Sequence, residues 1–172
     1  MTPETQPTAP ERIFNSPLEC GLRMLFVLQA TSPAASDLQR LISYDYLLVH
    51  SGDVDNETSS LHPAVPFRSS ELLVKRELVR HALDLMLARE LVEKKLSKAG
   101  ITYAASPLTA AFIDLLKSDY SAELRLRAEW VAARFGSMDD DDLNAFMAEN
   151  IGKWGAEFEK MTALHDLDLE IE

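Results

Sequence analysis

Hydrophobic residues recur at helical spacing along most of the chain, and short polar or proline-containing segments separate these stretches. The first stretch opens at Ser16-Pro17-Leu18-Glu19, where Ser16 can cap a helix, Pro17 suits its first turn and Glu19 completes a capping box. Apolar residues then follow at helical intervals until Thr31-Ser32-Pro33. The pattern therefore predicts a helix that ends near residue 31.

The same pattern predicts five more helices further along the chain. We expect them at residues 36–50, 70–89, 108–117 and 120–135, and from the Asp139–Asp142 run onward. The last of these begins with four aspartates, which suit the positive end of a helix dipole. A polar segment of about 15 residues separates the second and third helices, and loops of this length tend to be functional or mobile.

Two short β-prone runs stand between the third and fourth predicted helices. Leu91–Leu96 and Ile101–Ala104 flank the turn Ser97-Lys98-Ala99-Gly100, and Gly100 can supply the positive φ that a tight hairpin needs. The order helix, helix, helix, hairpin is that of a winged-helix domain, in which the third helix is the candidate recognition helix and the hairpin is the wing.

The predicted fold class is therefore mainly α, a winged helix (helix-turn-helix plus β-hairpin wing) with a C-terminal helical extension. We expect a disordered lead-in at residues 1–11, the winged-helix domain at 12–118, a helical extension at 119–162 and an acidic tail at 163–172.

Charge is unevenly distributed along the chain. The total is −11, but residues 68–98 hold eight basic and five acidic residues, whereas residues 138–172 hold two basic and eleven acidic ones. The acidic total argues against nucleic-acid binding by bulk charge alone. The basic segment coincides with the predicted recognition helix and wing, so it indicates a surface for DNA or for a partner protein.

Seven basic residues of this segment are the candidate partner- or DNA-contact residues: Arg68, Lys75, Arg76, Arg80, Lys94, Lys95 and Lys98. In a DNA-binding winged helix these elements meet the major groove and the adjacent phosphates. The alternative is a solvated helix face with pairs three or four residues apart, such as Arg80 with Glu77 and Asp84.

Catalytic motifs are absent from the sequence. It contains no phosphate-binding glycine loop, no G-x-S-x-G elbow and no H-E-x-x-H pair, and its one cysteine, Cys20, fits a buried structural thiol in a reducing cytoplasm. His50, Asp53 and His62 surround the long loop and could hold a divalent metal or pin the loop by hydrogen bonds. We expect no catalytic site, cofactor, metal, membrane or small-molecule substrate.

The C-terminal residues His165–Glu172 alternate between polar and apolar side chains with a period of two. This alternation is typical of a half-buried strand, which could add to an exposed sheet edge of the wing or of a partner. A frayed acidic tail is the alternative.

Several strings of residues resemble a bacterial family, the small middle component of ABC-three-component systems, a group that overlaps Lamassu-type antiphage defence. They cover about residues 11–136 and are Glu11–Glu19, Leu22-Arg23, Leu28, Asp45–Asp53, Ser60–Pro63, Pro66–Arg68, Glu71–Arg76, Gly100–Tyr103 and Phe112.

The resemblance implies a non-enzymatic adaptor or regulatory subunit in the cytoplasm. Its implied partners are an SMC/Rad50-like ABC ATPase, which senses foreign DNA, and an effector such as a nuclease. Contact with DNA within the complex stays open as an alternative. A winged-helix DNA-binding transcription regulator is the second hypothesis, motivated by the basic helix and wing.

Overall fold

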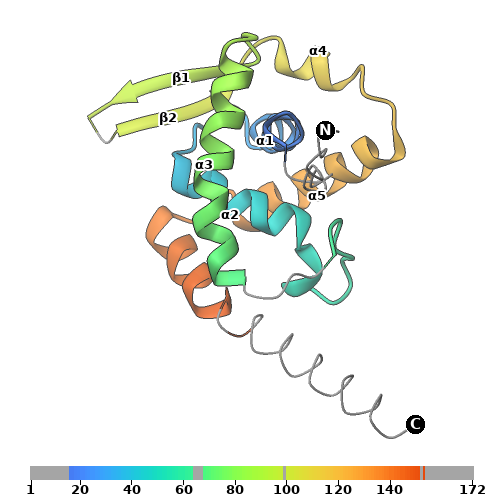
Figure 1. The fold of residues 1–172 in the computed structure, drawn as a ribbon, viewed down its shortest axis with the longest axis vertical. Coiled ribbons are helices and arrows are strands. Elements are labelled where there is room, and N and C mark those ends of the chain that lie inside the picture. The colour runs from blue at the N-terminus through green and yellow to red at the C-terminus, as the bar shows by residue number, and fades with distance from the viewer. Residues whose placement is uncertain (1–15, 64–67, 99, 152, 154–172) are drawn as a thin grey trace, which may run out of the picture.

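The computed structural model describes residues 16–63, 68–98, 100–151 and 153. The predicted lead-in at residues 1–11 and the acidic tail at 163–172 lie outside these residues. The described chain is mainly α-helical with a single two-stranded sheet, which confirms that the fold is mainly α (Figure 1).

The helices begin where the predicted caps stand. Helix α1 (Pro17–Ala30) starts after Ser16, whose hydroxyl accepts a hydrogen bond from the Glu19 amide, and α2 (Leu38–Val49) starts after Asp37, whose carboxylate caps the Arg40 amide. A short 3-10 helix, η1 (Ser51–Asp53), follows α2 directly. These caps satisfy amides that have no partner within the helix.

Helix α3 (Arg68–Leu87) leads into an antiparallel hairpin of β1 (Val92–Ser97) and β2 (Gly100–Ala105). Gly100 adopts φ +124°, as its predicted role in the turn requires. An isolated bridge joins Tyr103 of β2 to Ser36, the residue just before the Asp37 cap of α2, through two backbone hydrogen bonds of 2.8 and 2.9 Å. The hairpin is thus anchored at its base to the segment that connects α1 and α2.

The remaining elements are α4 (Thr109–Ile113), α5 (Asp119–Phe135) and a helix over residues 140–151. α4 ends at Ile113, four residues before the end of the predicted helix at 108–117, and the Leu115 and Leu116 amides then donate to carbonyls three residues earlier, as in a turn. α5 agrees with its prediction, and Ser118 caps it.

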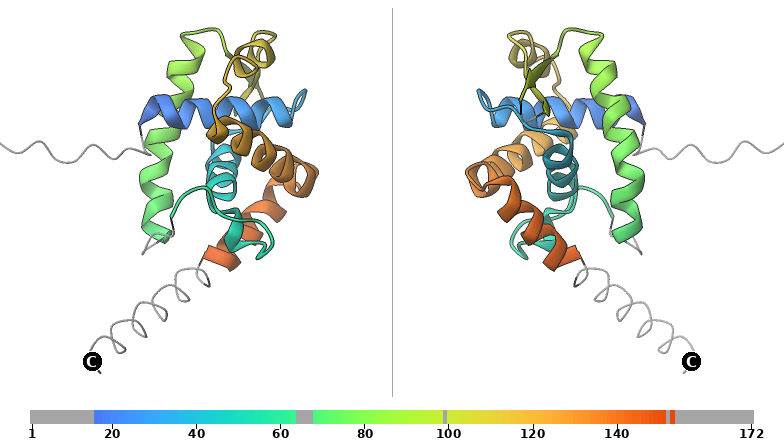
Figure 2. Two further views of the ribbon diagram at one scale, coloured as in Figure 1. Left: turned by 90° about the vertical axis from the view of Figure 1, so that its right-hand side faces the viewer. Right: turned by 90° about the vertical axis from the view of Figure 1, so that its left-hand side faces the viewer.

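The core is one cluster to which nearly every element contributes. α1 lies between α3 on one side and α5 on the other, and α2 packs against both (Figure 2). Phe135 of α5 and Leu143 and Met147 of the last helix belong to the same cluster as the side chains of α1 and α2. This packing holds the hairpin and α3 on one side of the molecule.

Candidate interaction surface and its buried support

The hairpin projects beyond α3 and carries exposed cations (Figure 1). Lys94 and Lys95 of β1 and Lys98 of the turn are all exposed, as predicted. In the described part of the chain none of the three forms an ion pair with a carboxylate. The three ammonium groups are therefore available to an acidic surface.

Two apolar side chains lie beside these lysines at the outer end of the hairpin. Leu96 is 80% exposed and Ile101 is 43% exposed, and they are direct cross-strand partners. Residues opposite each other in an antiparallel pair point to the same face, so Leu96 and Ile101 form one apolar patch. Lys94 and Tyr103 lie on that face too, nearer the base of the hairpin.

On the exposed face of α3, Arg80 is paired with carboxylates of the same helix. Arg80 donates a hydrogen bond to Glu77 over 2.7 Å and lies 3.7 Å from Asp84. These local pairs agree with the alternative in which this side of the helix is a solvated face. Arg76 is exposed, and Arg68 is the first residue of α3, with its side chain outside the described structure. Of the predicted surface, Arg76 and the hairpin lysines thus carry positive charge that no carboxylate of the described residues pairs.

Lys75 does not lie on the outer face of α3, and the prediction that grouped it with the exposed cations is wrong. Its side chain is buried, its Nζ donates to Asp45 Oδ2 over 2.8 Å, and it lies 5.8 Å from the centre of the Tyr46 ring. A buried ammonium needs a counter-charge, and Asp45 provides it.

Asp45 also binds Arg23, so that α1, α2 and α3 meet at one carboxylate. Arg23 donates from Nε to Asp45 Oδ1 over 2.7 Å and from Nη2 to Oδ2 over 3.3 Å, and both side chains are fully buried. Burial alone would raise the pKa of Asp45, but Lys75 and Arg23 hold it well below its ordinary value. The helical spacing of apolar residues did not predict this triad.

One signal in the sequence points to the triad. Asp45 is the one charged side chain in residues 41–49, and the structure buries every residue of this run. An aspartate within such a helix requires cations from its neighbours. The triad sets the position of α3, and through α3 the position of the hairpin that follows it.

The loop residues are held by hydrogen bonds and ring contacts. Tyr46 donates to Asp53 Oδ2 over 2.8 Å, His62 Nε2 lies 2.9 Å from the Tyr120 hydroxyl, and the His50 ring packs 4.9 Å from the Tyr46 ring. Among the residues that the structure describes, no three metal-binding side chains come together. The geometry fits the predicted alternative in which these residues pin the loop.

Burial, and to a smaller extent the nearby positive charge of Arg23, lowers the pKa of His62 to about 4. The ring is therefore neutral at physiological pH and can exchange a single hydrogen bond with the Tyr120 hydroxyl. This contact ties the end of the loop to α5.

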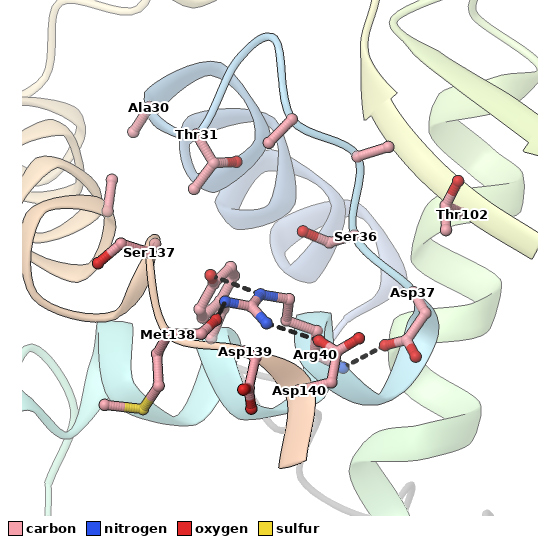
Figure 3. Close-up of a pocket in the computed structure, with 15 residues that line it drawn as sticks. Ala30, Thr31, Ser36, Asp37, Arg40, Thr102, Ser137, Met138, Asp139 and Asp140 are labelled. Carbon is pink, nitrogen blue, oxygen red and sulfur yellow. Dashed lines mark hydrogen bonds and ion pairs between the residues drawn. The ribbon is translucent and has the colours of Figure 1, made fainter. Parts of the chain in front are cut away.

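A pocket of about 640 Å³ lies between the α1–α2 connection and the segment that follows α5 (Figure 3). Arg40 lies in it and donates to Tyr44 over 2.8 Å, to Asp140 over 2.5 Å, and to the carbonyls of Phe135 and Met138. All of these partners belong to this chain. Arg40 therefore joins α2 to the end of α5, where a cation also suits the helix dipole.

Comparison with known proteins identifies one family. A family model described as ABC-three component (ABC-3C) system Middle Component 2 matches residues 13–157. The match extends past residue 136, where the resemblance in the sequence was expected to end, and includes the helix at 140–151. No curated protein and no solved structure matches the chain. In the described residues, no helix combines the length and hydropathy of a membrane span.

Proposed function

Because the chain belongs to the Middle Component 2 family of ABC-three component systems, we propose that it is a non-enzymatic adaptor subunit that docks through its hairpin. The proposed partners are an SMC/Rad50-like ABC ATPase and an effector such as a nuclease, in a cytoplasmic antiphage defence complex of the kind that overlaps Lamassu.

The order of the elements supports a winged-helix domain. Three helices precede the hairpin, and the Ser36–Tyr103 bridge adds a third, minimal strand against β2. In a winged helix the wing stands beside the third helix, and here the hairpin projects from the end of α3 (Figure 1).

The observation that carries the adaptor proposal is the composition of the hairpin surface. An 80% exposed leucine with an apolar partner, surrounded by three exposed lysines, combines a hydrophobic anchor with a charged rim. Protein interfaces are built in this way, with apolar anchors at the centre and polar groups around them. Substrate-binding sites, by contrast, are concave.

The self-paired cations of α3 favour protein over DNA as the main partner. A recognition helix reads base edges with side chains that are free to reach them, whereas Arg80 is paired with Glu77 and Asp84, and Lys75 is buried. Phosphates could still be contacted by the hairpin lysines once a partner supplies more positive charge.

Co-expression with the ATPase and effector encoded beside it tests the adaptor proposal. We expect a stable complex with the wild-type chain, and loss of the partner from Lys94→Glu/Lys95→Glu. Lys117→Glu is the matched control, since Lys117 is also exposed but lies between α4 and α5. A chain that remains alone beside both neighbours contradicts the proposal.

The transcription-regulator alternative is favoured by one feature, the three exposed lysines of the hairpin. It predicts binding of the isolated chain to its own promoter, with an affinity that falls steeply as salt rises. Absence of a mobility shift near physiological salt would exclude it.

A further inference from the structure

We propose that the open edge of β1 is a strand-acceptor site and that its occupant is the C-terminal segment of this chain, residues 165–172. This inference goes beyond the adaptor role, because it concerns a contact that the chain makes with itself or with a second copy. The C-terminal segment and the proposed partner would use the same patch of Leu96 and Ile101, so the segment occupies it only while the partner is absent.

The described sheet has one edge without a neighbour. The order of strands is β1-β2, and the far side of β2 already holds the bridge from Ser36 to Tyr103. β1 therefore forms the outer edge of a projecting hairpin, away from the helical body (Figure 1). An edge strand presents backbone amides and carbonyls that pair readily with another extended segment.

The two faces of this edge differ in chemistry. The pairing register of β1 and β2 places Leu96 and Ile101 on one face of the hairpin. It places Lys95 and its partner Thr102 on the opposite face. A third strand matches both faces only if apolar and acidic side chains alternate along it. Its apolar side chains then lie beside Leu96, and its acidic side chains lie beside Lys95.

The C-terminal segment has this alternation. Its apolar side chains are Leu167, Leu169 and Ile171, and its acidic ones are Asp166, Asp168, Glu170 and Glu172. In a strand the two sets face opposite sides, so one side can cover the exposed patch of Leu96 and Ile101 while the other faces Lys95.

The positive charge of the hairpin favours the acidic C-terminal segment over an uncharged strand. The outer half of the hairpin carries Lys94, Lys95 and Lys98, and Glu93, its one acidic side chain, lies nearer the base. Lysines on an edge strand discourage pairing with another copy of the same edge by like-charge repulsion. An acidic strand is attracted instead, and residues 138–172 carry eleven acidic side chains against two basic ones.

Hydrogen–deuterium exchange of the full chain, compared with a chain lacking residues 163–172, tests the proposal. We expect the β1 amides to exchange about tenfold faster in the shortened chain, while the amides of α1 and α5 stay unchanged. A peptide of residues 163–172 added to the shortened chain is expected to restore the protection.

A matched variant keeps every acidic residue of the C-terminal segment and replaces its three apolar side chains. Leu167→Ser/Leu169→Ser/Ile171→Ser is expected to behave like the shortened chain, and Lys95→Glu is expected to weaken binding of the peptide. Equal exchange of β1 in the full and shortened chains overturns the proposal, as does protection that arises only when another protein is added.

Analytical ultracentrifugation shows whether residues 165–172 pair with the hairpin of their own chain or with the hairpin of a second copy. A monomeric full chain with a protected β1 indicates its own tail. A dimer that the shortened chain does not form indicates the tail of a second copy. Both results support the site, and the adaptor role is tested separately, by co-expression.

Discussion

Replacing Asp45 with asparagine tests the interpretation that one buried carboxylate holds three helices together. The substitution changes the shape of the side chain little, but it removes the negative charge that the buried side chains of Arg23 and Lys75 share, while Arg23 keeps its 3.7 Å contact with Glu19. Removing one partner of a buried ion pair costs about 3–5 kcal/mol. Domains are stable by only about 5–15 kcal/mol, so we expect Asp45→Asn to lose a large part of the free energy of unfolding.

The pH dependence gives this prediction a second readout. The folded-state pKa of Asp45 lies below its ordinary value, so the carboxylate stabilises the fold fully above about pH 4, and this contribution is lost as the pH falls through the folded-state pKa. The stability difference between wild type and Asp45→Asn is therefore constant between pH 7 and pH 5. Below pH 4 this difference in the free energy of unfolding becomes smaller.

Urea unfolding followed by circular dichroism at pH 7, 5 and 3 measures both effects. A loss below about 1 kcal/mol at pH 7 would refute the reasoning. The control is the triple replacement Arg23→Met/Asp45→Leu/Lys75→Met, which removes all three charges together. We expect it to be far closer to wild type than the single variant, because no uncompensated charge remains buried.

Two further predictions concern contacts that join the helices to the C-terminal half. Arg40→Met removes hydrogen bonds to Asp140 and to the Phe135 carbonyl, and bonds to charged groups contribute about 1.5–3 kcal/mol. We expect the melting temperature to fall by roughly 2–4 °C for each kcal/mol lost, whereas an unchanged value would contradict the proposed link. The pKa of His62 is about 4, below its ordinary 6.5, so wild-type stability decreases as the pH falls from 6.5 towards 4, and His62→Gln is expected to lack that decrease. An NMR titration that gives His62 a pKa near 6.5 would exclude its burial beside Tyr120.

Local chemistry explains why most of the elements could be predicted from the sequence. The Ser16 cap and Gly100 at the hairpin turn act within a few residues of their own positions. Their effects on the backbone follow from side-chain hydrogen bonds and steric freedom that a short window of sequence contains. The hairpin that carries the exposed lysines was predicted on this basis.

The parts that were missed depend on residues far apart in the chain. Arg23 and Lys75 lie 22 and 30 positions from Asp45, and helical spacing alone treats charged side chains as surface residues. Ser36 and Tyr103 are also far apart in the sequence, so no local pattern predicts that they pair. Lys75 was therefore assigned to the wrong face of α3, and the anchor of the hairpin was not anticipated.

The affinity of hairpin variants for the proposed ATPase partner tests the adaptor proposal most directly. Leu96→Asp places a charge in the proposed interface, and Leu126→Asp is the control, because Leu126 is 54% exposed on α5. Replacing an interface anchor typically costs at least about 2 kcal/mol, a factor of roughly 30 in affinity. The proposal predicts a loss of that size for Leu96→Asp in calorimetric titration and none for Leu126→Asp. Equal affinities for the two variants would contradict docking through the hairpin.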